Sequence, residues 1–330
     1  MDFLIEYAMF LAKAVTIVLA IGAVLVMALM AAMKPKAGKG DLNFEDLSAN
    51  YQHLLNGLQQ ELLGKKAYKQ WAKTQKEQDK VHDNRLFVID FDGSMDAGEV
   101  ASLREEITAV LAVAKPEDEV LLRLESGGGV VHGYGLAASQ LDRLKQHKIP
   151  LTVAVDKVAA SGGYMMACIA DRIIAAPFAI VGSIGVVAQL PNFHKLLKKN
   201  KIDVEQFTAG EFKRTVTMFA ENTDKGREKF QRELEETHVL FKDFVRQHRP
   251  VLDIDDVATG EHWFGYQALS LRLVDELKTS DDYLLSQMAQ RQVFQVKYEI
   301  KKSFAEKAGL SAALAVRTLV QQANRLVIWR

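Results

Sequence analysis

The stretch VDKVAASGGYMMA, residues 155–167, joins an apolar run to a segment of small, helix-forming residues. Ser161 stands at the junction, with two alanines before it and Gly162 and Gly163 directly after it. A serine on a sharp strand-to-helix turn exposes its hydroxyl at the positive end of the helix dipole, and small neighbours let a substrate backbone approach. The same pattern is typical of a serine N-cap with no catalytic role. The stretch predicts a strand, a turn and a helix, with Ser161 as a candidate nucleophile.

Apolar runs and helix-like segments alternate on both sides of this junction. A long charged helix is expected at 224–247, after a series of short predicted strands at 86–91, 120–124, 151–155, 172–176 and 180–187. Alternation of this kind indicates a parallel sheet with helical crossovers. The predicted fold class is therefore α/β, built from repeated βαβ units.

Composition excludes several classes of function. The 42 basic and 42 acidic residues balance, so nothing favours nucleic-acid binding. The single cysteine, Cys168, rules out an intramolecular disulfide and lies in an apolar stretch typical of a core. Cys-x-x-Cys and His-Glu-x-x-His spacings are absent from the sequence, so neither a metal site nor another cofactor is predicted.

The N-terminal region predicts a membrane anchor. Residues 14–33 carry no charge, and 20 such residues are long enough to span a bilayer as a helix. A cleaved signal peptide is the rival interpretation, but Ala31-Ala32-Met33 is a poor cleavage site and lysines follow it. Those lysines outnumber Lys13 before the span, and positive-inside counting therefore favours a cytoplasmic catalytic region.

The predicted domain boundaries follow from this pattern. Residues 1–33 form the anchor, and residues 34–83 a linker with an amphipathic helix at about 44–80. That helix is expected to pack on a partner copy, on the body or on the membrane surface, or to act as a solvated spacer. Residues 84–290 form the main domain, and residues 291–330 a basic amphipathic tail.

Acyl transfer needs a nucleophile, a base and two oxyanion donors. The glycine run 127–129 follows a predicted strand, and the backbone N–H groups of Gly128 and Gly162 are candidate donors to one substrate oxygen. The residues alone leave the base open between His132, Lys213 and Lys157. A buried lysine suits the role because desolvation lowers the pKa of its ammonium group.

Four motifs resemble the signal peptide peptidase A family, peptidase family S49. They are LESGGGVVHGYG (124–135), VAASGGYMMA (158–167), GSIGV (182–186) and TAGEFKR (208–214). The resemblance implies a ClpP/crotonase-like fold and a Ser–Lys dyad, with Ser161 as nucleophile and Lys213 as general base. It also implies that Ser183 orients the lysine amine and that Gly128 and Gly162 form the oxyanion hole.

The chain departs from the family pattern at two positions. Gly127 stands where the family usually has proline, which loosens that turn. Arg272 replaces the usual glycine before Leu-Val-Asp, within a stretch expected to pack in the fold.

The resemblance implies a membrane-anchored serine endopeptidase of the bacterial inner membrane that cleaves peptides or membrane-associated polypeptides. Its expected partners are a peptide or protein substrate, membrane lipid and further copies of the chain, because relatives form rings with shared sites. Two alternatives remain at this stage. A crotonase-type acyl-CoA enzyme would share the fold, and an inactive membrane scaffold would use the helix at 44–80 and the basic tail.

Overall fold

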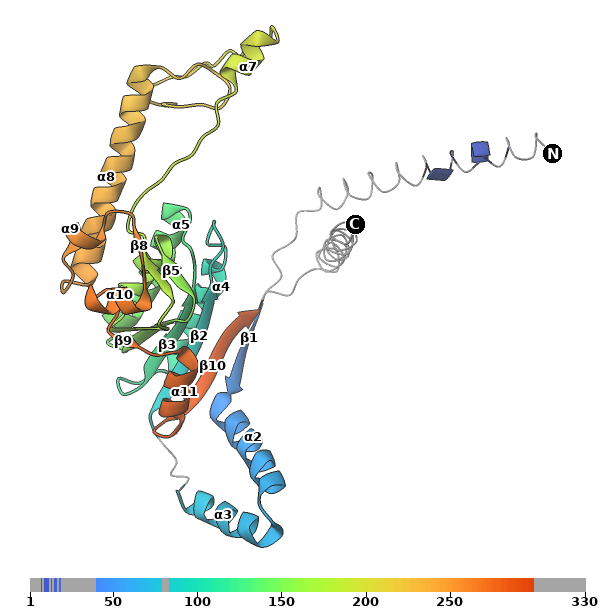
Figure 1. Ribbon diagram of the computed structural model, residues 1–330, viewed down its shortest axis with the longest axis vertical. Helices are drawn as coiled ribbons and strands as arrows, with labels where there is room; N and C mark the ends of the chain where they lie inside the picture. The colour runs from blue at the N-terminus through green and yellow to red at the C-terminus, as the bar shows by residue number, and fades with distance from the viewer. Residues whose placement is uncertain are drawn as a thin grey trace, which may run out of the picture. The chain divides into compact units, whose positions relative to one another are not determined.

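The computed structural model describes residues 40–78 and 83–299, together with scattered positions between 7 and 18 (Figure 1). The chain divides into two units, one of Met1–Asp41 with Glu299–Arg330, the other of Leu42–Tyr298. The predicted anchor at 14–33 lies outside the described residues except for positions 15, 16 and 18, and the predicted tail lies outside them from residue 300. Among the residues that are described, no helix is both long and apolar enough to cross a membrane.

A seven-stranded sheet forms the centre of the larger unit. Its strand order is β1-β10-β2-β3-β4-β6-β9, and neighbouring strands from β10 to β9 run parallel. The strands are β1 Asp41–Asp46, β2 Arg85–Asp92, β3 Glu119–Glu125, β4 Leu151–Val155, β6 Arg172–Ala175, β9 Glu276–Leu277 and β10 Gln292–Glu299. The predicted mixed α/β fold with a parallel sheet is confirmed.

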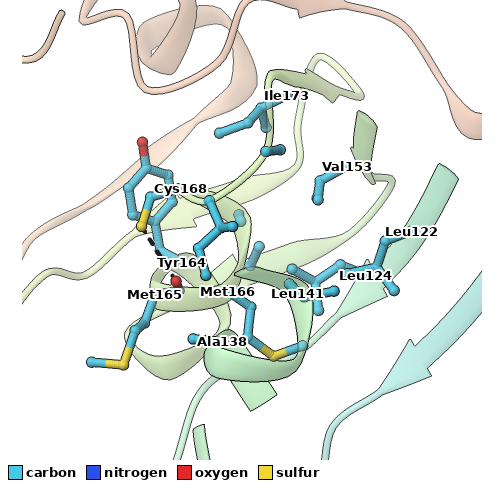
Figure 2. Packing of buried hydrophobic residues seen from close by; sticks show 14 of the residues in the cluster. Leu122, Leu124, Ala138, Leu141, Val153, Tyr164, Met165, Met166, Cys168 and Ile173 are labelled. Carbon is cyan, nitrogen blue, oxygen red and sulfur yellow. Dashed lines mark hydrogen bonds between the residues drawn. The ribbon is translucent and has the colours of Figure 1, made fainter. Parts of the chain in front are cut away.

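Helices cover both faces of this sheet. The main core lies between the sheet and three helices, α4 Val100–Val113, α5 Val131–Gln146 and α6 Gly162–Ala167. A smaller core on the opposite face includes Tyr283 and Leu284 of α11 Ser280–Met288. Figure 2 shows α6 in the main core, where Met166 lies beside Leu141 of α5 and Tyr164 lies beside Cys168. The short helix after Ser161 is therefore held by buried apolar contacts.

A second sheet positions the candidate site. It has three strands in the order β5-β7-β8, which span Val158–Ala160, Ile180–Gly182 and His262–Phe264. β5 runs parallel to β7, and a bridge between Ser126 and Ala159 joins β5 to the end of β3. The ends of β3, β5 and β7 thus meet beside the start of α6.

The structure corrects the prediction for the region before the main domain. The segment Asp41–Asp46 is an added strand of the sheet, so Phe44 is not helical. Asp46 accepts a hydrogen bond from Ala49 N and starts α2 Leu47–Leu62, and the chain then breaks near Gly64 before α3 Lys65–Gln78. The predicted single helix at 44–80 is two helices, and β10 likewise extends the sheet beyond residue 290.

A long segment, residues 183–223, separates β7 from α8 Asp224–His248 and is named the excursion. The predicted strand at 180–187 ends at Gly182. The excursion contains α7 His194–Lys199 and leads into α8. Figure 1 shows α8 reaching away from the sheet, with α7 near its far end. The remaining helices, α9 Ile254–Val257 and α10 Gly265–Ser270, lie beside the second sheet and the C-terminal half of α8.

Candidate active site

Ser161 has a strained backbone. Its φ and ψ are 53° and −118°, the conformation of the first central residue in a type II′ turn, where glycine is preferred. The turn is fixed on both sides, because Ser161 N donates to Gly182 O at 2.8 Å and Ser161 O accepts from Met165 N at 2.9 Å. A strained serine between strand and helix is the geometry of a nucleophile elbow.

The capping role considered from the sequence does not account for this serine. Ser161 precedes α6, but its side chain makes no capping hydrogen bond and its backbone is not in the extended region used by N-caps. Within the described part of the chain, no hydrogen bond to the Ser161 Oγ is found. The hydroxyl is half-buried and uncommitted, as a nucleophile requires.

The glycines around Ser161 are required by close contacts within the chain. A Cβ on Gly128, which has φ +85°, would lie 2.7 Å from both Gly162 N and Ser161 Cβ. A Cβ on Gly129 would lie 1.9 Å from Met95 O. Gly127 has open space around it, so a larger residue fits there sterically. Gly128 therefore brings the turn after β3 against the start of α6, and Gly129 brings it against Met95.

The two predicted oxyanion donors lie side by side but differ in their present partners. Gly162 N heads α6, and no acceptor for it is found among the described residues. Gly128 N donates to Ser126 Oγ at 3.0 Å. That bond pins the turn that Gly127 was expected to loosen, and a substrate oxygen would have to share the Gly128 N–H with Ser126.

Ser183 reaches the same place from β7. In the parallel pairing, Ala160 lies opposite Gly182, so Ser161 and Ser183 follow one another at the ends of adjacent strands. Ser183 also has positive φ, at 49°, and its N donates to Glu261 O at 2.7 Å. Its Oγ donates only a long 3.4 Å bond to Gly260 O. The structure therefore gathers Ser161, Ser183, Gly128 and Gly162 within one chain.

Lys213 lies in the same chain, in the segment between α7 and α8. It is exposed in the excursion, beside Glu211, which pairs with Lys225, and Phe212, whose ring centroid is 5.7 Å from Lys225 Nζ. His238 of α8 lies near the candidate site, because its Nε2 is 3.2 Å from the O atom of Ile184, the residue after Ser183. Lys225 precedes His238 by 13 residues, or roughly 20 Å of helix axis. A single chain thus does not bring Lys213 to Ser161.

The other two candidate bases are also poorly placed. Lys157 Nζ pairs with Glu125 at 2.8 Å, and this carboxylate hydrogen bond raises the pKa of Lys157. This pairing favours the ammonium form over the neutral amine that a base requires. His132 is exposed at the start of α5. Cys168 is buried, and burial raises the pKa of its thiol to about 12, which confirms the prediction of a core residue.

Two residues of the site could not be identified from residue type alone. Ser126 and Tyr134 are buried and linked by a hydrogen bond below the glycine turn. Both fall within the motif at 124–135, whose serine and tyrosine were the available signal. Their contact across the turn only becomes visible in the fold.

Comparison with known proteins defines the class. Residues 2–141 match the N-terminal domain of peptidase family S49, and residues 143–294 match the peptidase family S49 domain itself. The chain belongs to peptidase family S49.

Two relatives and one solved structure illustrate what the chain is similar to. The chain is 55% identical to the probable protease SohB of Haemophilus influenzae, over 94% of this chain and 93% of that protein. It is 50% identical to the probable protease SohB of Buchnera aphidicola subsp. Schlechtendalia chinensis, over 87% of this chain and all of that protein. Among solved structures, the 1510-N membrane-bound stomatin-specific protease with a substrate peptide aligns at a TM-score of 0.44 and 13% identity, over 68% of this chain and 95% of that one.

Proposed function

We propose that this protein is a membrane-anchored serine endopeptidase that uses Ser161 as its nucleophile and Lys213 as its general base. The observation that carries the proposal is the backbone of Ser161, strained at φ 53° with an uncommitted hydroxyl between Gly128 and Gly162. Strain of about 1–3 kcal/mol persists at a residue only where the surrounding structure imposes it, and such residues cluster at active sites. Membership of peptidase family S49 gives the reaction class.

The base is proposed to come from a neighbouring copy of the chain. Lys213 is too far from Ser161 within one subunit, so a dyad requires the excursion of one copy to reach the site of another. The excursion is suited to this, because many of its large apolar side chains are exposed. These are Val187, Leu190, Phe193, Leu196, Ile202, Val204, Phe207, Phe212 and Phe219. Many exposed large apolar side chains on one segment are typical of a protein interface.

The proposed reaction is acyl transfer to Ser161. The neutral amine of Lys213, shielded from water at the subunit contact and oriented by Ser183, takes the Ser161 proton as Oγ attacks the peptide carbonyl. The N–H groups of Gly162 and Gly128 stabilise the oxyanion. Lys213 then protonates the leaving amine, and water hydrolyses the acyl-enzyme ester.

Membrane attachment is part of the proposal. The uncharged residues 14–33 are proposed to anchor the chain in a bacterial inner membrane, with a fold of the ClpP/crotonase type beside it. The substrates would be peptides or membrane-associated polypeptides. An extended substrate is proposed to pair with the backbone near Ile184–Val187, where no strand is assigned and Val187 is almost fully exposed.

The test is proteolysis of casein by the full chain in detergent. Ser161→Ala and Lys213→Ala should each lower kcat by several orders of magnitude, whereas Lys157→Ala should leave it within about twofold. Activity should rise with pH, because an ammonium cannot act as base. Full activity in Ser161→Ala would refute the nucleophile. Loss of activity in Lys157→Ala with full activity in Lys213→Ala would reassign the base.

A further inference from the structure

A chain of three hydrogen bonds runs beneath the candidate site. Tyr134 Oη donates to Ser94 O at 2.8 Å and lies 2.5 Å from Ser126 Oγ, which accepts from Gly128 N at 3.0 Å. A hydroxyl carries one proton, so Tyr134 has none left for Ser126, and Ser126 must donate to Tyr134. The direction of the chain is therefore fixed, from Gly128 through Ser126 and Tyr134 to Ser94.

Burial makes these three hydrogen bonds energetically costly to break. Tyr134 is fully buried and Ser126 is 2% exposed, so neither hydroxyl has water as a substitute partner. Burial also raises the pKa of Tyr134, which keeps the phenol protonated and able to donate. An unpaired buried polar group loses the stabilisation of its partner and keeps the full cost of its desolvation.

The same tyrosine also contacts the other oxyanion donor. A Cβ on Gly162 would lie 2.4 Å from Tyr134 Cγ, so the ring packs directly on the backbone after Ser161. A Cβ on Gly163 would lie 2.5 Å from Ser126 O, and one on Gly93 would lie 2.6 Å from Tyr134 Oη. Tyr134 thus touches Gly162 with its ring and holds the Gly128 turn, through Ser126, with its hydroxyl.

We infer that Tyr134 and Ser126 are positioning residues that fix the two oxyanion donors relative to each other. This inference rests on the proposed function, since it needs Gly128 and Gly162 to act in catalysis. Oxyanion stabilisation depends on N–H groups that are preorganised before charge develops, and errors of about 1 Å cost rate. Neither Tyr134 nor Ser126 touches the reacting atoms. Both act on the spacing between donors that do.

The test compares Tyr134→Phe and Ser126→Ala with the matched control Tyr283→Phe. Tyr283 is also a buried tyrosine, and its Oη donates to Glu119 on the opposite face of the sheet. When the full chain is assayed on casein, Tyr134→Phe and Ser126→Ala should each lower kcat by about 10- to 100-fold. This is a smaller loss than removal of an entire oxyanion donor would cause. KM should stay within about twofold, and Tyr283→Phe should keep wild-type kcat.

Three further readouts separate positioning from a general structural effect. The kcat of the double variant should lie within about twofold of the kcat of the slower single variant, because both changes break the same series of hydrogen bonds. A serine-reactive phosphonate should label Ser161 more slowly in both variants. In a Ser161→Ala background, Tyr134→Phe should leave the affinity for a labelled casein peptide unchanged.

The outcomes are distinguishable from failure of the proposed function. Activity that survives Ser161→Ala refutes the nucleophile itself, whatever Tyr134 does. If Ser161→Ala is inactive but folded Tyr134→Phe and Ser126→Ala keep wild-type kcat, the positioning role is wrong. A rise of kcat in Ser126→Ala would also overturn it, since Ser126 would then restrain the Gly128 N–H rather than support it. If Tyr134→Phe fails to fold, Ser126→Ala alone decides in the same way.

Discussion

Replacing Ser161 by glycine should stabilise the fold even though it destroys the proposed nucleophile. Ser161 holds φ 53° and ψ −118°, and a side chain in such a conformation costs about 1–3 kcal/mol. Glycine avoids that strain but loses about 0.5–1 kcal/mol more through the entropy of the unfolded chain. Alanine lacks the hydroxyl but keeps the strain. With mid-range values for both terms, Ser161→Gly should be about 1 kcal/mol more stable than Ser161→Ala.

Urea or thermal unfolding of the full chain in detergent, at one fixed protein concentration, measures this difference. Ser139, exposed in the middle of α5, provides the control with the opposite sign. There glycine should be less stable than alanine by about 1 kcal/mol, as in any helix interior. If Ser161→Ala proves as stable as Ser161→Gly, the backbone of Ser161 is not strained and the main argument for its role fails.

Three further predictions follow from other parts of the fold. Arg272 (φ 61°) and Lys148 (φ 60°) lie just after helices α10 and α5, in the left-handed region that favours glycine. Arg272→Gly and Lys148→Gly should therefore each raise the free energy of unfolding by about 0.5–1 kcal/mol, as measured by urea titration. Unchanged urea midpoints would contradict this. Burial raises the pKa of Glu106 to about 7 from its unfolded value of 4.5, so its stabilising effect is present below pH 4.5 and is lost as pH rises through 7. Glu106→Gln should match the wild type in stability near pH 4.5 and exceed it at pH 8, and an identical difference at both pH values would refute that titration. Lys157→Met should leave the pH profile of proteolysis unchanged, because its ammonium only pairs with Glu125; a shifted profile would implicate it in catalysis.

The sequence predicts the strands and the turn at Ser161 well because both depend on local pattern. The predicted run at 151–155 matches β4 Leu151–Val155, and the expected helix at 224–247 matches α8 Asp224–His248. Ser161 falls at the predicted junction because apolar periodicity and the glycines that follow it are both visible in a short window.

Long-range contacts explain what the sequence does not predict. β1 and β10 join the sheet from opposite ends of the described region, and pairing between such distant segments leaves little local signal. The hydrogen bond between Ser126 and Tyr134 crosses a turn whose shape depends on Gly128 and Gly129. The position of Lys213 depends on how far α8 extends, so its chain distance from Ser161 gives no indication that the two lie apart.

The arrangement at Arg272 illustrates a third case. The loss of the family's usual glycine is readable from the sequence, but its consequence is not. Leu273 N donates to Ala268 O and Arg272 N donates to Leu269 O, so α10 ends in the motif that normally places glycine at this position. The structure turns a sequence difference into an expected cost in stability.

The most direct test of the account is complementation between two inactive variants. Ser161→Ala and Lys213→Ala chains would be co-expressed in equal amounts, purified together in detergent and assayed on casein. If each site takes Ser161 from one subunit and Lys213 from the next, random assembly should restore about one quarter of the wild-type activity. Separately purified variants should remain inactive. Co-assembled variants that show no activity would contradict a dyad shared between subunits.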